Sequence, residues 1–368
     1  MKNLLLTSML GSLLLFGCKK EPEERMDTTQ SPKALCGPVT TDQEWYQSDK
    51  KAPLIGGLDV LDFQITTKDS LVQGYFNQGL VLAYGFNHAE AARSFYYARK
   101  LDPDCAMAYW GYAYVLGPNY NAGMEPDNYE RAYEAVQKAL RLVEEGQYPE
   151  KEGDLIRALA KRYQAQAPED RSNLDQAYAQ ALGDLFKKYP EDADIATMYA
   201  EALMDMHPWD LYDKQGKAKA WTPEILKTLD RALEINPQHC GAHHLYIHAV
   251  EASNQPEKAL KSAQVFDEDL VPGAGHLIHM PSHVYIRTGD YHKGTVSNIR
   301  AVKVDSLYVT TCHAQGAYPL AYFPHNYHFM AATATLEGNS QWAILAANKV
   351  ASQSNVQLMK EPGWGTIQ

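Results

Sequence analysis

Apolar positions recur at helical spacing from about residue 70 to residue 358, and the pattern repeats about every 34 residues. The first unit begins at Val72 and contains two amphipathic segments, with small residues where the segments would touch and a proline after the second. Its diagnostic residues, at positions 4, 8, 11, 20, 24, 27 and 32, are Tyr75, Gly79, Leu82, Ala91, Phe95, Ala98 and Pro103. The pattern predicts an all-α chain whose repeating unit is a helix pair.

These positions resemble the tetratricopeptide (TPR) repeat, and the resemblance covers most of residues 70–358. In TPR proteins the helix pairs stack side by side, because a single pair cannot bury its own apolar face. The resemblance implies an α-solenoid of about seven TPR-like pairs over residues 69–358. The later pairs are expected to begin at Ala106, near Lys151, shortly before Tyr199, and at Cys240, Gly275 and Pro324.

Three segments flank the predicted solenoid. Residues 1–17 combine Lys2 with an apolar run that ends at Phe16, which predicts a secretion signal too short to span a bilayer. The segment Leu15-Phe16-Gly17-Cys18 resembles a bacterial lipobox and implies that Cys18 is lipidated after cleavage. Residues 18–68 form an irregular leader, and residues 359–368 form a tail. Because no aspartate follows Cys18, we expect a lipid-anchored protein of the bacterial outer membrane, on its periplasmic or surface face.

Charge and cysteine content exclude two classes of function. The net charge of -11, with no concentrated basic surface, argues against a nucleic-acid partner. The four cysteines other than Cys18 form no CxxC pair, which argues against a thiolate zinc site. The sequence contains no nucleophile elbow, phosphate loop or dinucleotide motif. Histidine is therefore the residue type that carries the candidate chemistry.

Eleven of the 13 histidines fall within residues 239–328, inside the His-rich region 239–335. The last three repeats, whose registers are set by Pro, Gly and Ala signals, place histidine at seven of nine positions numbered 2, 5 and 9. Composition alone would place roughly 0.3 histidines there. Position 2 is occupied by His276 and His325, position 5 by His244, His279 and His328, and position 9 by His248 and His283.

In TPR proteins these positions face the concave groove, so the resemblance implies a histidine-lined groove. Residues three, four and seven apart share one helix face, and adjacent helices lie about 8–10 Å apart, so rings from neighbouring helices can meet on one ion. We expect a transition metal ion, with Zn, Cu, Fe and Mn all open. The predicted ligands are His244, His248, Glu251, His276, His279, His283, His325 and His328.

Three further roles stay open at this stage. Glu251 is a ligand or a general base, and Glu201, in the same row of the fourth repeat, is a ligand, an orienting group or a general base. Arg287 is a candidate for binding a substrate carboxylate. Outside the array, His88 is expected at a turn, His239 as a helix cap and His243 as a structural residue. We expect solvated side chains at His292 and His313.

Five segments resemble a group of bacterial TPR proteins with many groove histidines and no settled activity; they are residues 86–91, 207–210, 247–251, 275–283 and 324–328. Two functional hypotheses follow. The first is a metalloprotein, and potentially an enzyme of unspecified reaction in which water or substrate takes an open position on the metal. The alternative is an interaction scaffold whose groove holds a peptide segment of a partner protein, or an anion, without metal.

Overall fold

The computed structural model describes residues 43–48, 50–312 and 318–353. Within these ranges the regular structure is helical and no strand forms, as predicted. The predicted signal segment, Cys18, the leader up to residue 42, the tail and His313 lie outside the described residues, so the expectations about them stay predictions. Among the helices that are described, none is long and apolar enough to cross a membrane.

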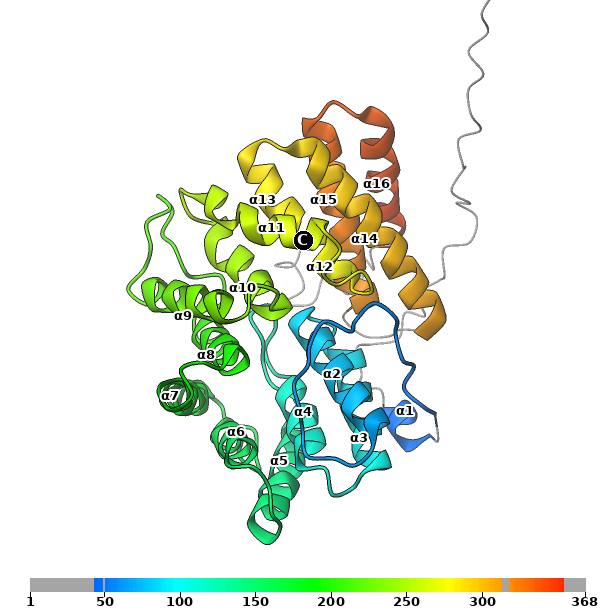
Figure 1. The fold of residues 1–368 in the computed structure, drawn as a ribbon. Helices are drawn as coiled ribbons and strands as arrows, with labels where there is room; N and C mark the ends of the chain where they lie inside the picture. The colour runs from blue at the N-terminus through cyan, green and yellow to red at the C-terminus, as the bar shows by residue number, and fades with distance from the viewer. Residues whose placement is uncertain (1–42, 49, 313–317, 354–368) are drawn as a thin grey trace, which may run out of the picture. The chain divides into compact units, whose positions relative to one another are not determined.

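Seven helix pairs follow one another along the described chain, and each helix packs against the next (Figure 1). A short helix, α1 (Gln43–Gln47), precedes them, and a π-helical turn, η2 (Tyr318–Tyr322), leads into the last pair. The pairs are α2 (Ser70–Tyr84) with α3 (His88–Leu101), α4 (Ala106–Leu116) with α5 (Asn128–Glu145), α6 (Glu150–Ala160) with α7 (Ser172–Lys188), α8 (Ala193–Asp205) with α9 (Thr222–Ile235), α10 (Cys240–Glu251) with η1 (Pro256–Ala259) and α11 (Leu260–Asp267), α12 (Gly275–His279) and α13 (Pro281–Thr288) with α14 (Tyr291–Cys312), and α15 (Phe323–Leu336) with α16 (Ser340–Gln353).

The predicted repeat registers agree with the observed helix starts. Helix α4 begins at Ala106, α10 at Cys240 and α12 at Gly275, while α15 begins one residue before Pro324. Asp69 caps α2 by accepting a hydrogen bond from the backbone N–H of Leu71. The helix starts fix the register of each helix, and the register determines on which helix face the histidines lie.

Small residues allow the first helices to approach one another. The ring of Phe95 on α3 lies between Gly79 on α2 and Gly111 on α4. A Cβ atom added at Gly111 would lie 2.3 Å from that ring, so only glycine fits there without movement of the helices. This contact explains the small residue that the repeat pattern requires at Gly79.

Residues 50–69 form no helix, as expected for the leader, yet they belong to the core. Leu58 and Phe63 are buried, and the backbone N–H of Gly273 donates to the carbonyl of Gly57 over 3.0 Å. Gly57 has a φ of 78°, and a Cβ atom there would meet the backbone of Gly273, so glycine is required at this crossing. The leader thereby links the first helix pair to the loop before α12.

A second long-range contact joins the first and fifth pairs. Helix α2 packs against α10, where a Cβ atom on Gly241 would lie 2.6 Å from the ring of Tyr84. This contact brings the α2–α3 turn next to the histidines of α10, which the repeat pattern does not predict. It determines what surrounds the candidate site.

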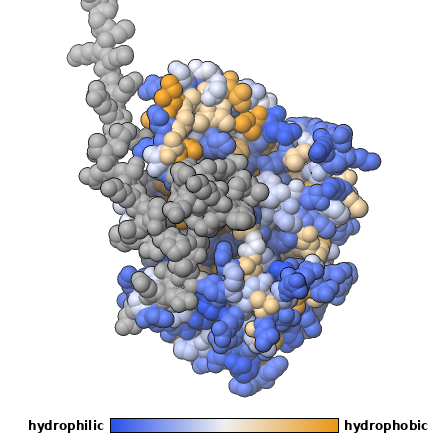
Figure 2. Space-filling model, turned by 180° about the vertical axis from the view of Figure 1, so that it is seen from behind, coloured by the Kyte–Doolittle hydropathy of each residue, from blue (hydrophilic) through white to orange (hydrophobic). Residues whose placement is uncertain are grey.

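On the face shown in Figure 2 the coloured surface is mainly hydrophilic, with apolar side chains gathered at its upper end, over the C-terminal helices. The exposed apolar side chains there include Leu336 at the end of α15 and Ile344 on α16. These two side chains are exposed, whereas the histidines of α10, α12 and α13 are buried.

Candidate metal centre

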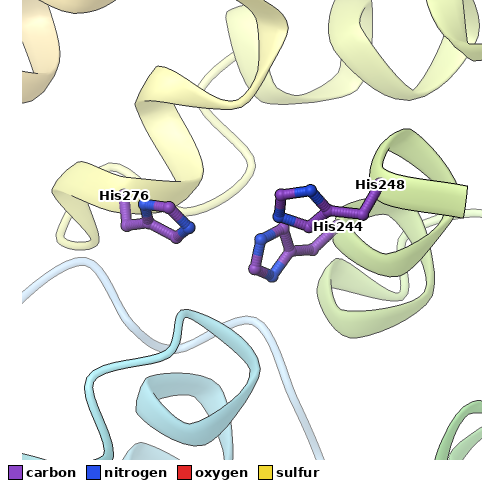
Figure 3. Close-up of side chains that lie close together, drawn as sticks. All are labelled: His244, His248 and His276. Atoms are coloured by element: carbon purple, nitrogen blue, oxygen red, sulfur yellow. The ribbon is translucent and has the colours of Figure 1, made fainter. Parts of the chain in front are cut away.

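Six histidines from three consecutive A helices converge with Glu251 in the interior of the protein. Potential ligand atoms lie within 4.8 Å of one another in three groups of three residues. We call His244, His248 and His276 the first triad, and Figure 3 shows the two rings of α10 facing the ring of α12. His279, His283 and His325 form the second triad, and the third group consists of His248, Glu251 and His283.

A proline divides the sixth A helix without turning its histidines away from one another. Pro281 has no backbone N–H, so α12 ends at His279 and α13 begins at the proline itself. Met280, between them, keeps helical angles of φ -52° and ψ -35°. His276, His279 and His283 therefore remain on one face at spacings of three and four.

Glu251 orients one ring of each triad. Its Oε1 accepts a hydrogen bond from Nδ1 of His248, and its Oε2 accepts one from Nδ1 of His283, both over 2.7 Å. An ionised carboxylate can only accept, so both Nδ1 atoms carry the proton and both Nε2 atoms carry a lone pair when the rings are neutral. Carboxylate partners of this kind fix the orientation of metal-binding histidines.

Two more rings are held in the same tautomer. Nδ1 of His244 donates to the backbone carbonyl of Tyr84 over 2.5 Å. Nδ1 of His279 lies 2.6 Å from Oδ1 of Asn298, whose amide orientation is fixed because its Nδ2 donates to the carbonyl of Gly294. Four imidazoles thus present an Nε2 lone pair to the centre.

These lone pairs meet without a donor between them. Nε2 of His279 lies 2.9 Å from Nε2 of His283, and two acceptors at that distance repel unless a cation lies between them. Among the described residues, no hydrogen-bond partner is found for Nε2 of His244, Nε2 of His248, either nitrogen of His276, or Nδ1 of His325. Buried nitrogens without a partner are costly, so these lone pairs are available to a ligand.

Burial lowers the pKa of five of these rings, those of His244, His248, His276, His279 and His325, and so favours their neutral form. It lowers the pKa of His325 to about 3 and, together with the neighbouring imidazoles, lowers the pKa of His244, His276 and His279 well below 6.5. Burial acts in the opposite direction on Glu251, but His283 and His248 outweigh it and hold the pKa of that carboxyl well below its usual value. Neutral rings and an ionised carboxylate are the forms that bind a cation.

Aromatic side chains enclose the centre. The ring of Phe86, in the turn after α2, lies 4.4 Å from that of His244, and the ring of Tyr322 lies 4.9 Å from that of His276. On the other side, the ring of Phe329 is 4.3 Å from that of His283. The expected groove is therefore closed, and the six histidines of α10, α12 and α13 are each at most 4% exposed.

Two of the enclosing residues adopt strained backbone conformations. Phe86 has a φ of 55° and Trp209 a φ of 57°, values that non-glycine residues rarely adopt. Both rings contact His248, at centroid distances of 5.8 Å and 5.6 Å. Strain of this kind gathers at functional sites, so both loops belong to the candidate centre.

No protein-family model matches the chain, and no curated protein matches it. The chain consists of TPR-like helix pairs. Similar solved structures include TTC0263, a thermophilic TPR protein of Thermus thermophilus, with 13% identity over 63% of this chain and 90% of that chain and a TM-score of 0.32. The human IFIT1 dimer with PPP-AAAA has 12% identity over 79% of this chain and 73% of that chain and a TM-score of 0.36.

A third solved structure is YrrB, described as a TPR protein with an unusual peptide-binding site. It has 16% identity over 65% of this chain and 91% of that chain, with a TM-score of 0.21. At these identities and TM-scores the likenesses say nothing about what this chain binds. The assignment of the TPR-like fold rests on the helix pairs themselves.

The structure does not bring every predicted site residue to the centre. His328 is exposed on α15 and belongs to none of the ligand groups that the described residues form. Glu201, on α8, accepts a hydrogen bond from the hydroxyl of Tyr114, and burial raises the pKa of its carboxyl. Arg287 is exposed and donates to the carbonyl of Ser253 over 3.3 Å.

Three of the remaining histidines fill the roles expected of them. His239 caps α10 by accepting a hydrogen bond from the backbone N–H of Ala242. His243 is buried between the hydroxyl of Ser262 and the carbonyl of Pro237, and burial lowers its pKa to about 4. His292 is exposed and lies 2.9 Å from the carboxylate of Glu337.

Sequence reasoning missed the partners that orient the rings. Asn298 lies on the B helix of the sixth pair, and the carbonyl of Tyr84 belongs to the first pair. The repeat pattern therefore does not predict that either one contacts a histidine. Phe86 and Trp209 did have a signal, because they fall in two of the five segments singled out in the sequence, residues 86–91 and 207–210. Their contact with His248 becomes evident only when α2 packs on α10.

Proposed function

We propose that this protein binds a transition metal ion through the Nε2 atoms of its buried histidines. The observation that carries the proposal is the opposed pair of His279 and His283, whose lone pairs face each other over 2.9 Å. With metal–nitrogen bonds of about 2.1 Å, two nitrogens this far apart would subtend roughly 90° at the ion, an ordinary coordination angle. A metal ion would turn a repulsive contact into a pair of bonds.

The donor set favours particular metals. Glu251 uses both oxygens to accept from imidazoles, so we assign it an orienting role in place of the ligand or general-base role expected from the sequence. What remains is a set of neutral imidazoles without thiolate or carboxylate ligands. Such sets suit Zn or Cu, whereas Mn and the two-histidine, one-carboxylate iron sites need oxygen donors.

Burial also favours an ion over a peptide in this part of the protein. The scaffold hypothesis requires a groove open to an extended segment, whereas Phe86, Tyr322 and Phe329 cover the rings. A peptide or protein partner would have to bind elsewhere on the TPR-like surface. The predicted lipidation of Cys18 would tether this metal-binding unit to the outer membrane.

Metal analysis tests the proposal directly. Protein purified without a chelator or a histidine tag should contain near-stoichiometric Zn or Cu, and His283→Ala should lose most of it. His328→Ala is the matched control, because it removes an exposed imidazole from the same region and should keep the metal. Protein that takes up no metal when supplied with Zn²⁺ or Cu²⁺, although its circular dichroism shows folded helices, would refute the function.

We expect the metal to remain bound well below pH 6.5. A proton displaces a metal only near the pKa of the ligand, and burial lowers the pKa of His325 to about 3 and those of His244, His276 and His279 below the ordinary 6.5. The neutral, metal-binding form therefore persists to lower pH, and half-release should occur well below the ordinary histidine pKa of about 6.5. Metal content after equilibration between pH 7 and pH 4 measures this. Half-release near pH 6.5 would indicate solvent-exposed ligands instead.

A further inference from the structure

The six histidines divide into two sets, and this division bears on how many ions they hold. We propose that the centre is dinuclear, with one metal ion in the first triad and one in the second. This inference rests on the proposed function and adds to it the number of ions and the order in which they bind. The class of ligand is a pair of divalent ions that prefer imidazole, with Zn²⁺ and Cu²⁺ as the leading candidates.

The spacing of the ligand atoms argues against one ion bound by all six rings. Two nitrogens on opposite sides of a single ion are about 4.2 Å apart, twice a bond of about 2.1 Å. The six histidines satisfy a limit of 4.8 Å only in groups of three, and the two triads have no member in common. Each triad by itself matches the three-histidine set that leaves one coordination position open.

The tautomers support the same division. In the second triad, His279 and His283 each have Nδ1 on a protein acceptor and direct Nε2 at the other ring. In the first triad, His244 and His248 likewise direct Nε2 inward, and neither of those atoms finds a partner among the residues described. In both triads, Nε2 lone pairs are therefore directed inward before any metal binds. One ion could bind the nitrogens of only one triad.

Glu251 makes two neighbouring cations tolerable. The rings of His248 and His283 lie 5.3 Å apart, one from each triad, and the carboxylate is hydrogen-bonded to both. Two buried divalent ions repel strongly at low dielectric, and a negative charge beside both reduces that repulsion. A single carboxylate bonded to one ring of each triad therefore lowers the cost of holding two ions.

The two positions should differ in affinity. In the second triad His279 and His283 are both oriented by hydrogen bonds, and their Nε2 atoms are already 2.9 Å apart. Each triad also has one ring that no hydrogen bond of the described residues orients, His276 in the first and His325 in the second. The triads therefore differ in the preformed His279–His283 pair, for which the first triad has no equivalent. The second triad should therefore fill first.

Titration of the full chain with Zn²⁺ or Cu²⁺ tests the inference. Calorimetry should resolve two binding steps of different affinity, with the second triad filling first, and mass spectrometry of the desalted protein should find two ions per chain. His276→Gln should retain one ion, the tight one, and His325→Gln should retain only the weak one. His328→Ala, the control, should retain both ions.

The outcomes separate this inference from the proposed function. One ion per chain in the wild type, for instance in the group of His248, Glu251 and His283, overturns the dinuclear centre and leaves metal binding intact. No ion overturns both. If His276→Gln and His325→Gln each lose both ions while circular dichroism shows intact helices, the triads are not separate sites and the inference is also overturned. The wild-type count decides the question even if a variant fails to fold.

Discussion

Glu251→Ala should weaken metal binding in both triads by roughly 10- to 100-fold without removing a metal ligand. The carboxylate accepts Nδ1–H from His248 and from His283, and these bonds hold both rings with Nε2 directed at the centre. Without them each ring can rotate or change tautomer, so part of the binding free energy goes into ordering the rings. Competition titration with a chromogenic chelator measures the change.

Two further variants distinguish orientation from ligation. Glu257→Ala, at an exposed carboxylate a few residues away, should leave the affinity unchanged. Glu251→Gln has one amide oxygen and can accept from only one of the two rings, so it should weaken one position more than the other. If Glu251 is itself a ligand, Glu251→Ala should abolish one ion completely and leave the other unaffected, which would contradict the orienting role.

The sequence predicted the helix starts well because they depend on local signals. Glycine, alanine and proline mark where helices cross and end, and these constraints act within one repeat. Gly275 and Cys240 were placed at helix starts on that basis alone, and the histidines followed from the register. Seven of the eight predicted ligands therefore lie together at the centre.

The one predicted ligand outside the centre, His328, shows the limit of the register. His276 and His279 occupy positions 2 and 5 of their repeat and both point inward, whereas at the same positions His325 points inward and His328 is exposed. Helix α12 is covered by α14 and α15, but within the described ranges no further A helix follows α15. A row of equivalent positions is buried only where a neighbouring repeat covers it.

Features that depend on distant contacts could not be predicted. The packing of α2 on α10 brings the carbonyl of Tyr84 to His244 across 160 residues and places the ring of Phe86 over the first triad. Nothing in a repeat pattern specifies contacts between its first and fifth units. The expected groove was therefore observed as an enclosed centre, which favours an ion, the occupant expected from the sequence, over the alternative of a peptide.

Saturating Zn²⁺ should raise the midpoint of thermal unfolding by roughly 6 °C for each ion bound, and a chelator should reverse the change. At about 1,000 times the dissociation constant, one ion that binds only the folded state adds about 4 kcal/mol to the free energy of unfolding. The effect should be large because the metal-free protein buries several imidazole nitrogens without partners, each at a cost of about 1–3 kcal/mol. Differential scanning calorimetry with and without Zn²⁺ measures the shift.

The stabilisation should also be local, since each repeat contacts mainly its neighbours. The ions would join α10, α12, α13 and α15, so amide hydrogen exchange should slow in these helices on metal addition. Helices α5 to α7 carry none of the ligands and should exchange at an unchanged rate, which makes them an internal control. Bound metal that shifts neither the midpoint nor the exchange of α10 to α15 would mean that the ion lies on the surface or binds the unfolded chain equally well. The buried triads would then not be its site.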